Sequence, residues 1–289
     1  MHRIDEPHPF SLETATLHYA EDLAVAAQHL ALELDLDFEK HTLTGVAKHS
    51  LIAMRNLKQL SFDAVDLDVS KVEVDGKAVE FDAASGRSLT VHLARALKPD
   101  TRFEVRISYR AAPQRGLYFV GKTQAWTQGQ DIDSRHWFPC LDTPAQKCSS
   151  EVKATFPRAM IALSNGALQS DTVKGAKRTM HYRLDAPHAP YLVTLVVGSF
   201  EVHEAKSGST TVRTFFPPGR KEDALRCVSR TPKMVAFFER LTGMPYAFGD
   251  YAQIFVSEFI FGGMENTTAT PLPDSVLHDS RAHADRKRP

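Results

Sequence analysis

The sequence has few cysteines, no long apolar run and no surplus of either charge, and these absences exclude several classes of protein. Its three cysteines form no CxxC pair, which argues against a disulfide framework and a thiolate zinc site and suits a reducing compartment. No stretch approaches the roughly 18 apolar residues of a membrane helix, and no apolar core follows a basic amino-terminal end. Thirty-five basic residues balance thirty-five acidic ones, so neither nucleic acid nor a membrane surface is favoured as a partner. We therefore expect a cytoplasmic protein.

The first two thirds of the chain are rich in strand signals. With 289 residues, two domains are expected. Strict alternation in LALELDLDF (30–38) predicts a half-buried strand, YLVTLVVGSFEV (191–202) predicts another, and Asp75-Gly76 marks a hairpin turn. Strands recurring this often predict a mainly β domain over residues 1–205, built as an antiparallel sandwich or a saddle-shaped sheet.

A helical pattern follows this β-rich part. The stretch KEDALRCVSRTPKMVAFFERLTG (221–243) has apolar residues at helical spacing. Pro232 should kink this helix or begin a second one with Thr231 as its cap, and Gly243 is a natural end. The region therefore predicts the opening strand, helix and strand of an α/β domain, which would begin at residue 206 and be incomplete at residue 289.

The stretch FIFGGMENTTAT (259–270) sets two glycines before a single carboxylate, directly after a predicted strand. Gly262 and Gly263 suit a bulge or turn, or else an exposed strand edge that another backbone can approach because glycine has no Cβ. Glu265 alone would be a solvated surface acid. Beside a peptide-binding edge, its carboxylate would capture the positive α-amino group of a peptide.

Two separated motifs resemble one known family. GGMEN (262–266) is similar to the exopeptidase signature GxMEN of the zinc aminopeptidases that include aminopeptidase N and the leukotriene hydrolases. TQGQDIDSRHWFPCLDTPAQK (127–147) resembles the TQ-x-E/Q segment and the FPC-x-D-x-P block of the same family. The resemblance covers essentially the whole chain. It implies a saddle-like β-sandwich followed by the start of a thermolysin-like α/β catalytic domain.

The resemblance also implies a substrate-binding site. Glu265 resembles the family glutamate that binds the free amino terminus of the substrate, and Gly262 and Gly263 resemble the backbone platform for its first residues. Gln130 stands where many members carry a second amine-binding glutamate. An amide oxygen accepts a hydrogen bond from the ammonium group but adds no charge, so the site would be less negative here.

Other residues of the two motifs have less specific interpretations. Gln128 matches a family position lining the first side-chain pocket. Met264 and Phe261 would flank that pocket, or else belong to the core. Arg135 and Asp142, seven positions apart, are expected to tie loops together rather than to carry chemistry.

The histidines do not suggest a zinc site. His136 stands beside a tryptophan and is expected to be structural. His278 and His283 are five positions apart, so on a helix they would not share a face, and they make a poor zinc pair.

The zinc-binding motif of the family is missing from this sequence. Activity in the family requires an HExxH helix, whose histidines bind zinc and whose glutamate is the general base. The only His-Glu pair here is His203-Glu204, and no histidine follows it at the required spacing. The resemblance thus implies zinc in the full-length family member, whereas we expect no cofactor to bind this chain and no catalytic residue within it.

Two functions remain open at this point. The chain is either the amino-terminal part of a zinc aminopeptidase, truncated before the zinc helix, or a noncatalytic β-sandwich module that binds peptide amino termini or a protein partner. The expected partners are a peptide with a free amino terminus and, for the first alternative, the missing carboxyl-terminal part of the enzyme.

Overall fold

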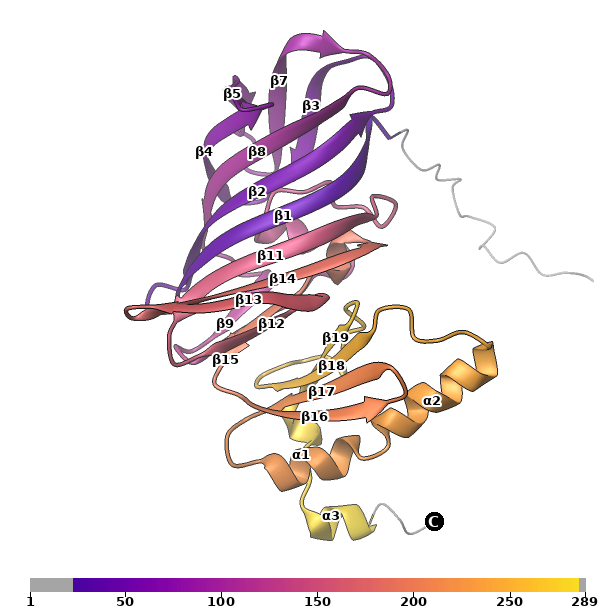
Figure 1. Ribbon diagram of the computed structural model, residues 1–289. Helices are drawn as coiled ribbons and strands as arrows, with labels where there is room; N and C mark the ends of the chain where they lie inside the picture. Colours follow the sequence, from indigo (N-terminus) through magenta and orange to yellow (C-terminus); the bar gives the residue numbers. More distant parts are fainter. Residues whose placement is uncertain (1–22, 286–289) are drawn as a thin grey trace, which may run out of the picture.

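A computed structural model describes residues 23–285, and strands dominate it (Figure 1). The largest sheet contains β1 (Val25–Asp37), β2 (Thr42–Ala53), β4 (Leu67–Val74), β5 (Lys77–Ala78), β8 (Arg102–Ala111), β11 (Cys148–Pro157), β13 (Ala167–Lys174) and β14 (Lys177–His188). Its strand order is β13-β14-β11-β1-β2-β8-β4-β5. Only the β1–β11 pair is parallel in this sheet.

The predicted strand and hairpin signals in this sheet are confirmed. The alternating leucines of β1 point to one face and are buried, with Leu32 and Leu36 each 1% exposed. A strand buries alternate residues because successive side chains point to opposite faces. The turn between β4 and β5 places Asp75 and Gly76 at positive φ, 50° and 75°, as a two-residue hairpin turn requires.

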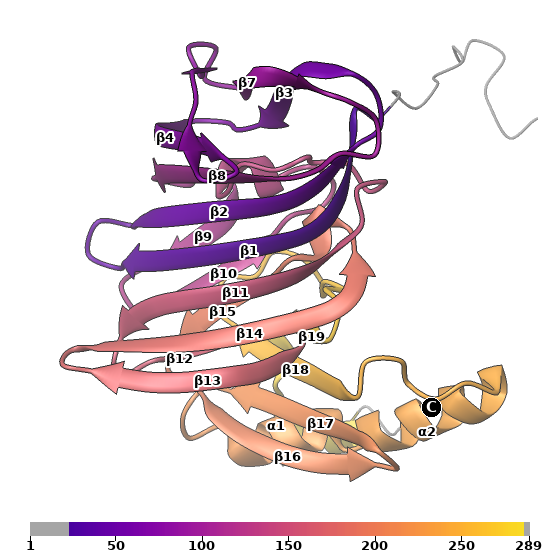
Figure 2. The same ribbon diagram turned by 45° about the horizontal axis from the view of Figure 1, so that its top comes forward.

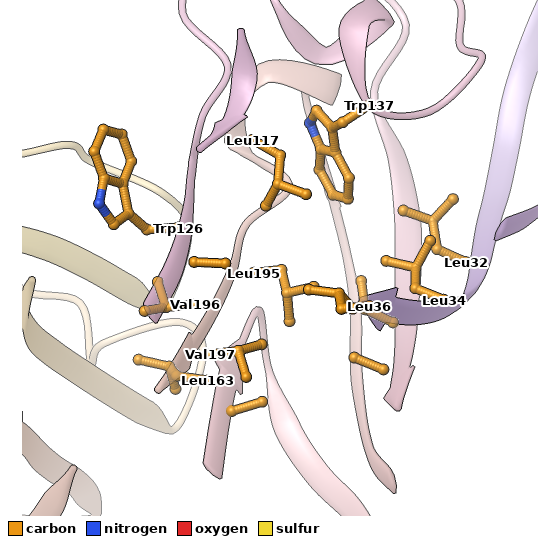
Figure 3. Packing of buried hydrophobic residues seen from close by; sticks show 14 of the residues in the cluster. Leu32, Leu34, Leu36, Leu117, Trp126, Trp137, Leu163, Leu195, Val196 and Val197 are labelled. Carbon is orange, nitrogen blue, oxygen red and sulfur yellow. The ribbon is translucent and has the colours of Figure 1, made fainter. Parts of the chain in front are cut away.

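A second sheet packs against the concave side of the first (Figure 2). It contains β9 (Gly116–Val120), β10 (Gln124–Gln128), β12 (Ile161–Ser164) and β15 (Leu195–Gly198), in the order β12-β15-β10-β9. Leu32, Leu34 and Leu36 of β1 belong to the same buried cluster as Leu117 and Leu195 (Figure 3). These two layers make the predicted antiparallel sandwich.

A small sheet covers a separate buried cluster at one end of the β-rich part (Figure 1). Its strands are β3 (Leu57–Asp63), β6 (Phe81–Asp82) and β7 (Ser88–Leu97), in the order β3-β7-β6, and both pairs are antiparallel. The mainly β, antiparallel architecture predicted from the sequence is therefore present.

One predicted strand is in fact two strands in different sheets. Residues 191–202 were expected to form a single strand, but β15 ends at Gly198 and β16 (Glu201–Ser207) starts the next sheet. The aromatic ring of Phe200 lies over Gly198, where a Cβ would be only 2.8 Å from a ring atom. The apolar pattern runs through this change of sheet without interruption, so alternation alone could not reveal it.

The last sheet combines strands and helices. β16 is followed by β17 (Thr210–Phe216), β18 (Asp250–Val256) and β19 (Ala269–Pro273), in the order β16-β17-β18-β19. The β17–β18 and β18–β19 pairs are parallel, and α1 (Lys221–Val228) and α2 (Thr231–Thr242) form the first crossover. A short helix, α3 (Ser280–Asp285), follows the sheet. The domain boundary near residue 205 stays a prediction. No helix within residues 23–285 has the length and apolarity to cross a membrane.

The helical region resolves one alternative and corrects one detail. Two helices form, as the second alternative for Pro232 predicted, and α2 ends at Gly243, which has a φ of 69°. The capping prediction was wrong, because Arg230 occupies the cap position and Thr231 is the first helical residue. The Thr231 hydroxyl instead donates to Gln253 Oε1 on β18 at 2.9 Å, which fastens α2 to the sheet.

Candidate functional site

The candidate site forms where β10 meets the segment after β18. Gln124, Trp126 and Gln128 share one face of β10 because alternate residues of a strand point the same way. Trp126 Nε1 donates to the Ser257 carbonyl at 3.0 Å, and Ser257 N–H donates to Gln124 Oε1 at 2.8 Å. The Trp126 ring also packs edge-on against Phe259, with centroids 4.9 Å apart. Figure 3 shows Trp126 pointing away from the side on which Leu117 and Trp137 lie.

These contacts correct the prediction that a strand leads straight into the two glycines. β18 ends at Val256, and the chain then turns, with Glu258 at a φ of 58°. Side chains of β10 form hydrogen bonds with both the N–H and the carbonyl of Ser257. These groups therefore do not pair with a neighbouring strand, and the backbone leaves the sheet at this residue. Gly262 and Gly263 consequently lie in a loop between β18 and β19 rather than on a strand edge.

The returning half of this loop is held by main-chain hydrogen bonds. Met264 N–H donates to the Pro271 carbonyl at 3.1 Å, and Ala269 N–H donates to the Asn266 carbonyl at 3.0 Å. The β12–β13 connection adds two contacts from the β sandwich: Asn165 Nδ2 donates to the Thr267 carbonyl and Gly166 N–H donates to Thr268 Oγ1, both at 2.7 Å. The loop is therefore fixed to both parts of the protein.

Side chains of the GGMEN stretch alternate between the interior and the surface. Met264 is 2% exposed and Asn266 is 3% exposed, whereas Glu265 between them is exposed. Among residues 23–285, Glu265 has no hydrogen-bond or ion-pair partner. Of the two alternatives for Met264, burial favours the core. No heavy atom lies within 4 Å of the place that a Cβ on Gly262 would occupy, so the backbone there is open to approach.

The two predicted glutamines lie at the end of β10. Gln128 is 4% exposed, and its Oε1 accepts the main-chain N–H of Gln130 at 2.9 Å. Gln130 itself is exposed. Gln128 lies two residues after Trp126, on the same face of β10, which meets the loop. Within the described part of the chain, no hydrogen bond joins Gln128 or Gln130 to Glu265. Phe261 is 40% exposed, with its ring 5.7 Å from that of Phe259.

Sequence reasoning missed the residues that hold the site together. Trp126, Gln124 and Ser257 form its central contacts, and Asn165 supplies the clamp from the sandwich. Alternation along β10 could have placed Gln124 and Trp126 on the face of Gln128, because each of these residues is two positions from the next. No local signal marks Asn165, whose partner is 102 positions away.

Arg135 and Asp142 have the structural role that was predicted for them. Arg135 donates to Asp142 Oδ2 from its backbone N–H at 3.1 Å and from Nε at 3.0 Å. Its Nη1 lies 3.0 Å from Asp63 Oδ1, and Asp142 N–H donates to Asp63 Oδ2 at 3.0 Å. Burial raises the pKa of the Asp142 carboxyl, against the opposing effect of its hydrogen bonds from Arg135. The network ties the end of β3 to the segments that carry Arg135 and Asp142. It borders a hollow of about 720 Å³ whose lining includes no residue of 257–270.

The comparisons with known proteins agree with this architecture. The chain matches the Peptidase M1 N-terminal domain over residues 16–192 and belongs to that family. It is 26% identical over 281 residues to leucine aminopeptidase 2 of Ajellomyces capsulatus, covering 91% of this chain and 45% of that protein. It is 26% identical over 252 residues to a probable aminopeptidase 1 of Saccharolobus solfataricus, covering 85% of this chain and 31% of that one.

Solved structures show the same fold. The crystal structure of an M1 zinc metallopeptidase from Deinococcus radiodurans matches with a TM-score of 0.75 at 20% identity, over 90% of this chain and 62% of that one. The same enzyme's E323A mutant with a bound Tyr-Ser-Ala substrate matches with a TM-score of 0.79 at 21% identity, over 89% of this chain and 62% of that one. The chain spans less than half the length of the curated relatives described above.

The residues described here do not fit the zinc that those structures name. Within residues 23–285, no group of three or more His, Cys, Asp or Glu side chains is placed to hold a metal ion. His136 Nε2 lies 3.8 Å from Asp133 Oδ1, and burial lowers the pKa of His136.

Proposed function

We propose that this chain carries the substrate-anchoring part of an aminopeptidase. Glu265 binds the α-ammonium group of a peptide, and the backbone at Gly262 and Gly263 lies along its first residues. The observation that carries this proposal is an exposed carboxylate that has no partner among residues 23–285 and lies on the fixed, returning half of its loop. Family membership and the aminopeptidase names of the relatives support it.

The surroundings of Glu265 suit an ammonium ligand. A charge-assisted hydrogen bond from an ammonium group to a carboxylate is stronger than a neutral one. Because the loop is fixed on the returning side of the glutamate, little ordering of the backbone is needed when a peptide binds. In the proposal, the exposed amide of Gln130 adds an uncharged acceptor, and Gln128 orients Gln130 through its main-chain N–H. Met264 supports the loop from the core.

Cleavage of the first peptide bond by a longer protein is part of the same proposal. The metal site would be formed by residues other than 23–285. The metal would be zinc, because the matching solved structures are those of a zinc metallopeptidase. We expect the chain alone to release no amino acids from peptides. A zinc-dependent release of amino-terminal residues, proportional to the amount of purified chain, would contradict this. A cytoplasmic location stays a prediction.

The test compares two peptides of the same sequence, one with a free amino terminus and one acetylated, by calorimetric titration of the purified chain. The free peptide should bind, and acetylation should weaken binding by about tenfold or more because the ionic contact is lost. Glu265→Gln should reduce the affinity for the free peptide to that of the acetylated one.

Glu258→Gln is the matched control, because Glu258 is another exposed glutamate at the start of the same loop. This substitution should leave both affinities unchanged. Equal binding of the two peptides by the unmodified chain would overturn the assignment of Glu265. Binding that responds to acetylation but not to Glu265→Gln would place the amine site on other residues.

A further inference from the structure

Cys227, His278 and His283 form a hydrogen-bonded row that shares no residue with the candidate peptide site. Cys227 Sγ lies 3.0 Å from His278 Nδ1, and His278 Nε2 lies 3.0 Å from His283 Nδ1. The two imidazole planes differ by only 11°, with centroids 5.2 Å apart. The prediction that these histidines would not share a face applied to a helix containing both. His278 precedes α3, so the chain can bring the rings together.

Arginine side chains of α1 also hold the main chain that carries His278. Arg226, next to Cys227 on α1, donates from Nη1 to the His278 carbonyl at 2.8 Å and to Asp223 Oδ1 at 2.9 Å. Arg220 at the start of α1 donates to the Leu277 carbonyl at 3.4 Å. The backbone that carries His278 is thus fixed on the helix that carries Cys227.

The contacts determine which ring nitrogen of His278 carries the proton. Nδ1 lies 3.0 Å from the Val276 carbonyl oxygen, which can only accept a hydrogen bond, so Nδ1 carries a hydrogen. The same N–H faces the sulfur of Cys227, whose own S–H donates to the Val276 carbonyl at 3.3 Å. When Cys227 loses that proton, the His278 N–H can donate to the thiolate. Nε2 on the other side of the ring can gain a second proton and donate it to His283 Nδ1. Protonated His278 would then face a thiolate with one N–H and His283 with the other.

This arrangement differs from a metal site. His278 uses opposite ring nitrogens toward Cys227 and His283, so one ion cannot contact all three side chains. It agrees instead with the arrangement of a nucleophile, a partner imidazole and a third group that orients the imidazole. The two other thiols have a different environment, because burial raises the pKa of Cys140 well above its ordinary value and that of Cys148 to about 11.

We propose that Cys227 is a reactive thiol and a site of modification by low-molecular-weight disulfides of the glutathione type. The thiolate attacks one sulfur of the disulfide, a new bond forms at Sγ, and the original sulfur–sulfur bond breaks. The departing thiolate takes up the proton that Cys227 had released, so one thiol is consumed and one is produced. His278 and His283 are positioning residues, and the peptide site has no part in the reaction.

The charges around the row act in both directions. Cys227 lies in the last turn of α1, where the helix dipole disfavours a negative charge. The guanidinium groups of Arg226 and Arg220 oppose this effect, while Asp223 partly neutralises both. A fixed N–H aimed at the sulfur is therefore needed to favour the thiolate.

The test is the reaction of the folded chain with glutathione disulfide at pH 7, followed by intact mass and by peptide mapping of the modified cysteine. Cys227 should be modified first, about tenfold faster than Cys148 or Cys140. Cys227→Ser should remove the fast phase. His278→Asn should slow it by about fivefold or more, since asparagine can donate a hydrogen bond but cannot become a cation.

The pH profile separates a thiolate-stabilising role from a merely structural one. Near pH 10, where accessible thiols are ionised regardless of their neighbours, His278→Asn should react as fast as the parent chain. A deficit that persists there would mean that the substitution only altered access, and would overturn the proposal. His92→Asn, at an exposed histidine on β7, is the control and should leave the rate unchanged. First modification at Cys140 or Cys148 would also overturn it.

Discussion

Trp126 donates its indole N–H to the carbonyl of Ser257 at 3.0 Å, across 131 positions of sequence. The donor belongs to the β sandwich and the acceptor directly follows β18 of the last sheet. The N–H of Ser257 donates to Gln124 on the same strand as Trp126. One strand face therefore both ends β18 and aims the loop that carries Glu265. The position of the candidate anchor depends on the junction between the two parts.

Trp126→Phe tests this junction. Phenylalanine keeps an aromatic ring against Phe259 but leaves the half-buried Ser257 carbonyl without its donor, which costs about 1–3 kcal/mol in addition to the lost ring volume. Trp137→Phe is the matched control, because Trp137 is fully buried and its Nε1 has no partner within the described part of the chain. In urea unfolding, Trp126→Phe should be the more destabilising of the two. Equal losses would mean that the Ser257 contact contributes nothing.

Asp142→Asn should weaken the loop network. The Asp142 carboxylate is buried and accepts two hydrogen bonds from Arg135. Its neutralisation leaves the partly buried guanidinium with Asp63 as its one ion-pair partner among residues 23–285, beside the main-chain carbonyl of residue 142. Removing one partner of a buried ion pair lowers the free energy of unfolding by about 3–5 kcal/mol. Asp185→Asn, at an exposed pair with Arg183, should change the free energy of unfolding by less than about 1 kcal/mol. Similar values for the two substitutions would contradict the assigned role.

Much of the fold could be predicted because its strands are regular. The buried leucines of β1 and the turn at Asp75-Gly76 follow from period-two alternation and from the positive φ that the turn requires. The break after Gly198 could not be predicted, because strands on both sides carry the same apolar pattern and only tertiary packing assigns them to different sheets.

The conformation of the candidate site could not be predicted from the sequence, and the role of Glu265 stays a prediction. The GGMEN stretch pointed to Glu265, but a strand was expected where Ser257 instead diverts the chain into a loop. That outcome depends on Gln124 and Trp126, which are more than 130 positions away. The contact between His278 and His283 was missed because it depends on where α3 begins.

His49 should make stability depend on pH. Its ring is buried, Nε2 contacts the Pro139 carbonyl at 2.9 Å, and burial lowers its pKa to about 4. Between pH 6.5 and about 4 the unfolded chain takes up a proton that the folded chain does not, so stability falls as the pH falls. The loss should approach about 3 kcal/mol at pH 4. His49→Leu should flatten this part of the pH profile of unfolding, and an unchanged slope would assign the effect to other groups.

Gly166→Ala should disrupt the clamp on the Glu265 loop. Gly166 has a φ of 79°, and a Cβ there would lie 2.0 Å from the Arg183 carbonyl oxygen. The backbone must shift, which also displaces the N–H that binds Thr268. We expect the free energy of unfolding to fall by about 3 kcal/mol or more, as at other strained or overpacked positions. Gly175→Ala, at a similar φ of 60° but with open space around it, should cost only about 1–2 kcal/mol.

Asn165 and Asn266 offer the sharpest comparison, because both amides are buried and only one has partners. Asn165 is 2% exposed; its Nδ2 donates to the carbonyls of Leu192 and Thr267, and its Oδ1 accepts the Thr194 N–H. Asn266 is 3% exposed, and neither of its side-chain polar atoms has a partner among residues 23–285.

Replacement by leucine, which has a similar volume, should therefore have opposite effects at the two positions. Asn165→Leu leaves three main-chain groups unpaired and should lower the free energy of unfolding by about 3 kcal/mol or more. Asn266→Leu removes an unsatisfied buried amide and should be neutral or stabilising by up to about 1–2 kcal/mol. Urea unfolding of both variants at neutral pH measures the difference. A large loss for Asn266→Leu would show that this amide has a partner, such as a buried water molecule, and that the loop beneath Glu265 is held from the interior as well as from the β12–β13 connection.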